Sequence, residues 1–170
     1  PEGFHTRIKL KENIRNSLQI AELASALVGD AIPARGPNSY EVEFFECKET
    51  DAILLADVIV EQLTDREGWQ PGEIALLTTK NRHPEHAAQA DKNRNAYFES
   101  LWESEDVFYG TVGGFKGLER PVVILAIDGF HHAEELTDFL YVGLTRARDK
   151  LVVVGDQEML NLIRKTEENN

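Results

Sequence analysis

Three short apolar runs constrain the fold of this chain more than any other feature of its sequence. Residues 74–78, 122–127 and 151–154 consist almost entirely of valine, isoleucine, leucine and alanine, and each has the length of a buried strand. Segments with apolar residues at the 3.6-residue spacing of a helix lie between them. Strands that alternate with helices, and that are apolar on both faces, predict an α/β fold with a mostly parallel central sheet and helices on both faces.

The expected helices begin and end at residues that commonly cap them. Asn16 and Gln19 have the spacing of a capping box and Gly29 stands where a C-terminal cap is expected, so a helix is predicted over 16–28. Thr50 is the expected cap of a second helix. The remaining expected elements are helices at 96–102 and 134–147, a short amphipathic helix before the polar tail 166–170, and strands at 6–10, 41–47 and 107–112. The strand at 107–112, like the one at 122–127, is expected to be buried on both faces.

Length and composition limit the possible classes of protein. A chain of 170 residues suits one buried domain, and we expect residues 1–170 to form it. The net charge of −12 means that any grip on nucleic-acid phosphates must be local or shared with a more basic partner. A single cysteine, Cys47, fits a reducing, cytoplasmic compartment. The chain has no membrane span, signal peptide or initiator methionine, so we expect a piece of a longer, non-membrane protein.

Two arginines are candidates for binding an anion. Arg146 is expected in the last turn of the helix over 134–147, where its rigid fork of donors suits phosphate oxygens. The alternative is a solvated arginine that interacts favourably with the helix dipole. Arg15 precedes the N-terminus of the first helix, an unfavourable position unless an anion binds between them, or Glu12 or another carboxylate forms an ion pair with it.

Residues 111–119 resemble a glycine-rich phosphate loop but have the wrong order. Gly113, Gly114 and Gly117 surround Lys116, whereas a P-loop needs G-x-x-x-x-G-K-[ST], which occurs nowhere in the chain. The chain therefore has no main cradle for nucleotide phosphates. Because ligands of parallel sheets bind outside the carboxyl ends of the strands, we expect the functional residues just after the strands.

The other reactive side chains are interpreted as structural. The histidines at 83, 86, 131 and 132 are expected in polar loops without a cysteine nearby, so no metal site is predicted. Cys47 lies in a strand pattern and is expected to pack in the core. Trp69 and Trp102 are expected to be packing groups as well.

Three segments together resemble a known family. The sequences at 13–17 (NIRNS), 111–119 (TVGGFKGLE) and 141–147 (YVGLTRA) resemble, in this order, motifs IV, V and VI of superfamily 1 DNA helicases of the UvrD/Rep type. The resemblance implies that the chain is the second, C-terminal RecA-like motor domain, a three-layer α/β sandwich. It also implies ATP with Mg²⁺, bound in the cleft with an N-terminal RecA-like domain of the same protein that carries the Walker A and B motifs.

The resemblance assigns a role to each matching position. Arg15 and Arg146 match the two catalytic arginines that reach the γ-phosphate across the cleft. Glu119 matches a carboxylate near the ribose, and Gly117 belongs to the same ATP-binding set. The residues that match contacts with single-stranded DNA are Thr111, Gly113 and Lys116.

Some positions depart from the family pattern. Ile14 stands where the family usually has a tyrosine that stacks on adenine, and Gly113 stands where it usually has histidine. The segment 80–106 is too short for the accessory domain that UvrD and Rep insert between motifs IV and V. The resemblance thus predicts an ATP-dependent helicase or translocase whose isolated C-terminal domain lacks ATPase activity. The alternative is a degenerate, non-hydrolysing binding or regulatory module.

Overall fold

The central sheet of the protein is entirely parallel. The computed structural model describes residues 13–29, 34–103, 105–131 and 136–164, and across these residues five strands form one sheet in the order β1-β5-β4-β2-β3. Every neighbouring pair of strands is parallel, which confirms the predicted α/β fold. The strands are β1 (Glu43–Glu46), β2 (Ile74–Thr78), β3 (Phe108–Thr111), β4 (Arg120–Ala126) and β5 (Ala147–Gly155).

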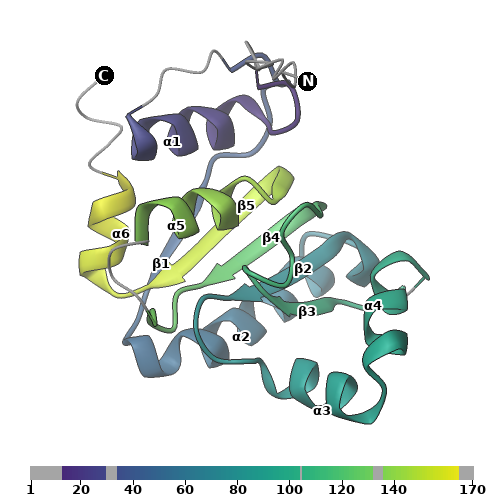
Figure 1. Cartoon of the computed structure of the whole chain (residues 1–170). Coiled ribbons are helices and arrows are strands. Elements are labelled where there is room, and N and C mark those ends of the chain that lie inside the picture. The colour runs from purple at the N-terminus through teal and green to yellow at the C-terminus, as the bar shows by residue number, and fades with distance from the viewer. Residues whose placement is uncertain (1–12, 30–33, 104, 132–135, 165–170) are drawn as a thin grey trace, which may run out of the picture.

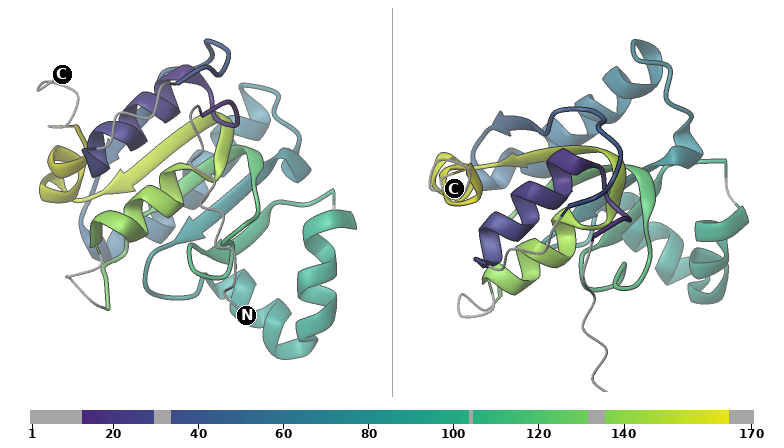
Figure 2. Two further views of the ribbon diagram at one scale, coloured as in Figure 1. Left: turned by 45° about the horizontal axis from the view of Figure 1, so that its top comes forward. Right: turned by 90° about the horizontal axis from the view of Figure 1, so that it is seen from above.

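Helices cover both faces of the sheet, as predicted. Helices α1, α5 and α6 pack on one face and α2 packs on the other, while α3 and α4 lie beside the edge strand β3 (Figures 1 and 2). The helices are α1 (Leu18–Val28), α2 (Ala52–Asp65), α3 (Pro84–Lys92), α4 (Arg94–Glu103), α5 (Leu136–Leu144) and α6 (Gln157–Arg164). Short 3₁₀ turns at Glu49–Asp51 and Pro71–Glu73 precede α2 and β2.

The apolar runs that predicted the strands supply the core on both sides of the sheet. Successive side chains of a strand point to opposite faces. Leu125 and Val153 therefore pack in the cluster with α1, α5 and α6, whereas Ile124 and Val152 pack in the cluster with α2, and all four are fully buried. The central strands are thus buried on two faces, as their composition predicted.

Helix α5 packs closely against β4 because it carries a glycine at the contact. A Cβ atom added to Gly143 would lie 3.1 Å from a methyl group of Leu125 and 3.3 Å from one of Val112. Ordinary Cβ contacts are longer than this, so a larger residue would push the helix away from the sheet. The close packing fixes the position of the turn that follows α5, where Arg146 lies.

The capping box predicted at the start of the first helix is wrong. Helix α1 begins at Leu18 with Ser17 as its N-cap residue, and Ser17 makes no side-chain capping bond. Asn16 and Gln19 form tertiary hydrogen bonds instead, because partners from distant segments lie within reach of both side chains. The predicted C-terminal cap is confirmed, since Gly29 is left-handed with φ of 66°.

Two other helix boundaries differ from the prediction. Helix α5 ends at Leu144, and Ala147 is the first residue of β5, where it pairs with Arg120 of β4. Helical spacing placed Ala147 on a buried helix face, but a fully buried strand residue gives the same apolar signal. Thr50 lies in a 3₁₀ turn rather than capping α2, which begins at Ala52. The strand expected at 6–10 and the tail 166–170 lie outside the described residues.

The segment 80–106 contains two helices, although only one was predicted. The expected helix at 96–102 is part of α4, and the missed helix α3 precedes it. His83 does not lie in a polar loop: it is 3% exposed, and its Nδ1 accepts a hydrogen bond from the backbone N–H of Glu85 at the start of α3. Its Nε2 lies 3.0 Å from Asp57 on α2, so the histidine joins the two helices. Strand β3 is an alternating edge strand rather than a strand buried on both faces.

Candidate nucleotide-side and nucleic-acid-side residues

The residues assigned to nucleotide binding lie at the amino ends of strands, which corrects the expectation that functional residues follow the strands. Glu119 immediately precedes β4 and Arg146 immediately precedes β5. The first residues of these strands, Arg120 and Ala147, are partners in the sheet, so Glu119 and Arg146 enter it side by side. Thr111, in contrast, is the last residue of β3 and lies at the carboxyl end, as expected.

Arg15 pairs with Glu119 at this edge. Its Nε lies 3.1 Å from a carboxylate oxygen of Glu119, and the two side chains are 52% and 39% exposed. Glu12, the partner named from the sequence, lies outside the described residues, but the alternative of an ion pair with another carboxylate is confirmed. An ion pair this exposed contributes little to stability because water screens it. Arg15 can therefore exchange Glu119 for a stronger anion at small cost.

Asn16 holds the segment that carries Arg15 against the segment that carries Arg146. Its side-chain amide donates hydrogen bonds to the backbone carbonyls of Thr145 at 3.0 Å and Ala147 at 2.6 Å, and the residue is only 2% exposed. The backbone N–H of Ser17 adds a 2.7 Å bond to the carbonyl of Arg148. Residues 129 and 131 positions apart in the chain are thereby fixed next to each other.

The guanidinium of Arg146 is buried and held by hydrogen bonds rather than solvated. Its Nε donates to the carbonyl of Val142 at 2.8 Å, which caps the C-terminus of α5, and its Nη1 donates to the carbonyl of Leu118 at 3.1 Å. Its Nη2 donates to the hydroxyl of Thr145 at 3.1 Å. The residue is 8% exposed, so the alternative of a solvated arginine is wrong.

The charges around Arg146 act in opposite directions. Burial lowers the pKa of Arg146 and the positive charge of Arg15 lowers it further, whereas Glu119 and Tyr141 raise it. An arginine remains charged at neutral pH despite such shifts. Two guanidinium groups and one carboxylate thus lie within electrostatic reach of each other, and an additional negative charge would be attracted there.

The loop 112–119 is a compact turn around one buried aromatic ring. Phe115 is fully buried, and its N–H donates to the carbonyl of Thr111 at 3.0 Å. The hydroxyl of Thr111 accepts a 3.1 Å bond from the N–H of Gly114, so Thr111 closes the turn. Gly117 has φ of 88°, a left-handed conformation that glycine adopts without strain. Lys116 and Gly113 are exposed on this loop.

The same loop connects the two ends of the sheet. Thr111 pairs with Thr78, which pairs with Ala126 at the carboxyl end of β4, whereas Glu119 lies just before the amino end of that strand. The loop therefore runs back along β4, a distance of about 20 Å at about 3.3 Å per residue. It joins the predicted DNA-contact residues to the predicted nucleotide-contact residues over the shortest available path.

A hollow of about 340 Å³ lies between this loop and α5. Gly113 and Lys116 line it from the loop, and Asp138, Phe139 and Val142 line it from α5. Val142 is also the residue whose carbonyl binds Arg146. The hollow and the buried guanidinium therefore share one helix.

The thiol of Cys47 is partly buried. Cys47 packs beside the α2 cluster, and burial, with the nearby Asp51 and Asp156, raises the pKa of its thiol. Among the described residues, no group of three or more histidine, cysteine, aspartate or glutamate side chains is arranged to hold a metal ion. Ile14 is 73% exposed beside Arg15, so its side chain is available to a ligand or partner.

Two structurally important polar residues were missed in the sequence. Asn16 was assigned to a helix cap, although its place within the segment 13–17 marked it as part of a motif. Asp128 follows β4 and is 5% exposed; its carboxylate accepts hydrogen bonds from Thr79, Lys80 and Asn81, which follow β2. The available signal for these hydrogen bonds was a single aspartate directly after an apolar run.

Comparisons with known proteins agree with the motifs. The family described as UvrD-like helicase C-terminal domain matches residues 106–154. A solved structure of the C-terminal domain of a possible DNA helicase from Lactobacillus (strain WCFS1) is similar, with 16% identity, a TM-score of 0.46 and coverage of 85% of this chain and 88% of that chain. No curated protein matches the chain.

The described helices include none with the length and apolar character needed to cross a membrane. The matched segment holds the residues of motifs V and VI, including Thr111, Glu119 and Arg146, whereas Arg15 lies before it. The resemblance to UvrD-like helicases that the motifs indicated is thus confirmed for residues 106–154, from just before β3 through nearly all of β5.

Proposed function

We propose that the chain is the C-terminal motor domain of an ATP-dependent DNA helicase or translocase. In this proposal Arg15 and Arg146 contact the γ-phosphate of ATP, and Glu119 and Gly117 lie on the nucleotide side. The Mg²⁺ and the other phosphates are held mainly by an N-terminal RecA-like domain of the same protein. The observation that carries the proposal is the meeting of Arg15, Glu119 and Arg146 at one edge of the sheet, although they are far apart in the sequence.

The donor inventory of Arg146 fits a phosphate ligand. A guanidinium has five N–H donors. Three hydrogen bonds to described residues orient it, and these leave two donors for an anion. The bound nucleotide would supply the phosphoryl group, whose transfer spreads negative charge over its oxygens. A guanidinium fixed by backbone carbonyls needs little reorganisation to stabilise that charge.

The loop 112–119 is the proposed link between the nucleotide and single-stranded DNA. Leu118 accepts a hydrogen bond from Arg146 at one end of the loop, and Thr111 closes the turn at the other end. Thr111, Gly113 and Lys116 are proposed to contact the strand. A shift of Arg146 towards a phosphate would therefore alter the backbone that carries these contacts.

The test uses the longer protein that contains the partner domain. Arg146→Ala should lower DNA-stimulated ATP turnover by about 10³–10⁵, the range found for arginines that stabilise phosphoryl transfer. Arg148→Ala is the matched control, because Arg148 is an exposed arginine two residues away that pairs with Asp149. Near-normal turnover in the Arg146 variant would refute the proposal. The isolated chain is expected to hydrolyse no ATP.

The second candidate function is a non-hydrolysing module with the same fold. The exposed Ile14 favours it, since an aliphatic side chain offers no aromatic surface for stacking on a base. The two functions differ in what the parent sequence must contain. A strand, a G-x-x-x-x-G-K-[ST] loop and a helix upstream of this chain would support the motor, and a parent sequence without that unit would support the module.

A further inference from the structure

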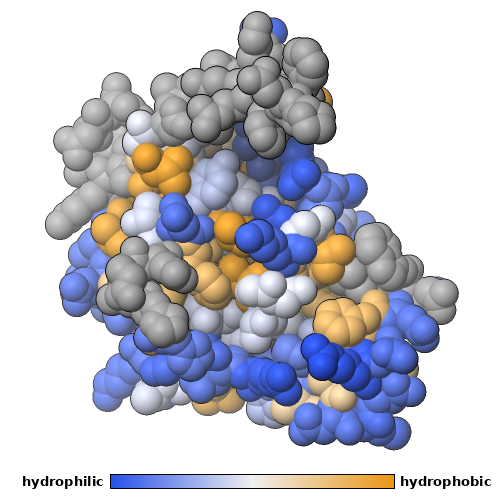
Figure 3. Space-filling model, viewed as in Figure 1, coloured by the Kyte–Doolittle hydropathy of each residue, from blue (hydrophilic) through white to orange (hydrophobic). Residues whose placement is uncertain are grey.

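A second hollow, of about 340 Å³, lies between the turn at Thr111 and helices α3 and α4. We call it the hairpin hollow, because α3 and α4 form a helical hairpin beside it. Its lining includes Arg82, His86, Arg94, Phe98, Thr111 and Gly114. At the lower right of Figure 3, where α3 and α4 lie in Figure 1, hydrophobic residues stand among hydrophilic ones. Its location matters because Thr111 and Gly114 belong to the turn proposed to contact DNA.

The hairpin hollow is locally basic on a strongly acidic chain. Arg82 and Arg94 line it, whereas the chain as a whole carries a net charge of −12. Arg94 is exposed and forms no ion pair with any residue that the structure describes. The one carboxylate of the lining, Asp91, lies 3.9 Å from Arg82, and both side chains are more than half exposed. Such a pair is weak, so both guanidinium groups remain available to phosphates.

An exposed aromatic ring lies next to these charges. Phe98 is 44% exposed and is placed four residues after Arg94, so both lie on one face of α4. Its ring contacts Tyr97 edge-on at 5.1 Å, and Tyr97 in turn stacks on His86 at 4.5 Å with only 5° between the ring planes. The ring of Phe98 is therefore supported from behind. An apolar ring held in this way is a suitable surface for stacking a base.

His86 adds a polar group that the fold leaves unused. The residue is 7% exposed and lines the hairpin hollow, and its Nδ1 has no hydrogen-bond partner among the described residues. Burial and the nearby Arg82 lower the pKa of His86, so its ring is neutral at neutral pH. Buried polar atoms usually have partners, and an unpartnered one beside a hollow is consistent with a ligand.

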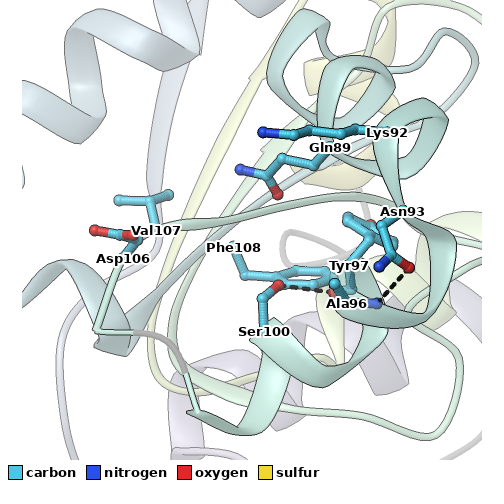
Figure 4. Close-up of a pocket in the computed structure, with 9 residues that line it drawn as sticks. All are labelled: Gln89, Lys92, Asn93, Ala96, Tyr97, Ser100, Asp106, Val107 and Phe108. Carbon is cyan, nitrogen blue, oxygen red and sulfur yellow. Dashed lines mark hydrogen bonds between the residues drawn. The ribbon is translucent and has the colours of Figure 1, made fainter.

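The hollow shown in Figure 4 differs in character and provides a control. It lies on the other side of the α3–α4 hairpin, where Lys92 and Gln89 face Val107 and Asp106 across it. One lysine and one aspartate give it no net positive charge. The hydroxyl of Tyr97 donates a hydrogen bond to the backbone carbonyl of Tyr109, so this donor already has a partner. We therefore expect phosphates to bind more weakly here than in the hairpin hollow.

We propose that the hairpin hollow extends the single-stranded nucleic-acid site beyond the loop 112–119. Arg82 and Arg94 bind backbone phosphates, and Phe98 stacks on a base. The strand would pass from Lys116 over the turn at Thr111 to α4, since residues of this turn line both hollows. This inference rests on the proposed function, which assigns nucleic-acid contacts to the loop.

The test measures binding of a fluorescent oligo(dT) of about 15 nucleotides, a length within the usual site sizes, by anisotropy at several salt concentrations. Arg82→Ala and Arg94→Ala should each weaken binding and lower the salt slope by about 0.7 for one lost phosphate contact. Phe98→Ala should weaken binding about tenfold with the slope unchanged, as expected for lost stacking. Asp91→Asn should tighten binding, because it removes a repulsive charge.

Lys92→Ala is the matched control, since it removes one exposed positive charge beside the other hollow and should bind like the wild type. Thermal unfolding of each variant checks that it is folded. Substitutions at exposed positions should leave the fold intact. A parallel oligo(rU) titration distinguishes DNA from RNA as the preferred strand. If Arg94→Ala and Phe98→Ala bind like Lys92→Ala while Lys116→Ala is weakened, the inference fails and the proposed role of the loop stands. No binding by the wild type would overturn both nucleic-acid contacts, whereas the turnover test on Arg146 is independent of them.

Discussion

Replacing Asn16 should separate the two arginines from each other by removing the contact between their segments. The Asn16 amide is the donor to the carbonyls of Thr145 and Ala147, and its oxygen accepts a 3.0 Å bond from Asn13. At 2% exposure, water does not replace these bonds without structural change. Gly36 packs directly against the backbone of Asn16, because a Cβ atom at Gly36 would overlap the carbonyl of Asn16.

The magnitude follows from the groups left unsatisfied. Asn16→Ala leaves two backbone carbonyls without this donor, and each unsatisfied buried group costs about 1–3 kcal/mol. Allowing for partial access of water, we expect a loss of about 3 kcal/mol in the free energy of unfolding, or about 6–12 °C in Tm for a chain of this size. Asn16→Asp keeps the shape but sets a carboxylate oxygen against the two carbonyl oxygens. It should cost about 4 kcal/mol or more, because a buried charge without a donor is added.

Urea unfolding followed by circular dichroism measures both losses as shifts of the midpoint at constant m value. Asn13→Ala is the control, since it removes the bond to the Asn16 oxygen and the bonds that Asn13 accepts from the N–H groups of Arg15 and Asn16, but leaves the bonds to the two carbonyls. Because these bonds are exposed or partly buried, it should cost about 1 kcal/mol. An Asn16→Asp variant as stable as the wild type would show that the amide does not donate to these carbonyls. In that case the argument that Asn16 fixes Arg15 relative to Arg146 would be refuted.

Two further predictions concern polar groups elsewhere in the fold. Asp128→Asn should lower the free energy of unfolding by about 3 kcal/mol, because the new amide nitrogen faces donors such as the N–H of Asn81; urea unfolding at constant m measures it. For Lys150, burial alone would lower the pKa, but hydrogen bonds and charges from Glu43 and Glu67 outweigh burial and raise it. A group whose pKa is higher in the folded state than in the unfolded state stabilises the fold. Its contribution to the free energy of unfolding is complete at pH values below the unfolded pKa and is lost as pH rises through the folded pKa. Urea midpoints should therefore fall above about pH 10.5, and Lys150→Met should remove this part of the pH dependence.

The predicted strands were more accurate than the predicted helix ends, for a physical reason. Ile74–Thr78 forms β2 with the predicted boundaries, since a turn precedes it and the strand is buried on both faces. Ala147 was assigned to a helix because burial, not periodicity, determines its apolar character. Helix α3 has almost no apolar face, so spacing could not reveal it. His83 followed by Pro84 and Glu85 was the available signal, because proline and an acidic residue favour the first turn.

The residues of the candidate site were named from sequence motifs, but their arrangement in space was not predicted. Sequence motifs identified Arg15, Glu119 and Arg146 as a set, and the fold brings Arg15 and Glu119 to 3.1 Å. The amino-end location of the set depends on the register of β4 with β5, which no local pattern contains. Asn16 was misassigned for the same reason, since its bonding partners lie more than a hundred residues away.

The burial of Arg146 explains how one residue can serve two ends of the proposed site. A buried guanidinium is stable only when its donors are bonded, and its partners here belong to α5, to the turn after α5 and to the loop 112–119. Under the proposed function, a phosphate would bind the two donors that these partners leave and would draw the guanidinium towards itself. The bond to Leu118 is the one that joins Arg146 to the loop 112–119, whereas Val142 on α5 and Thr145 in the turn after it lie within four residues of Arg146. A nucleotide that attracts Arg146 would therefore loosen the loop that carries Thr111 and Lys116, and its release would let the loop close again.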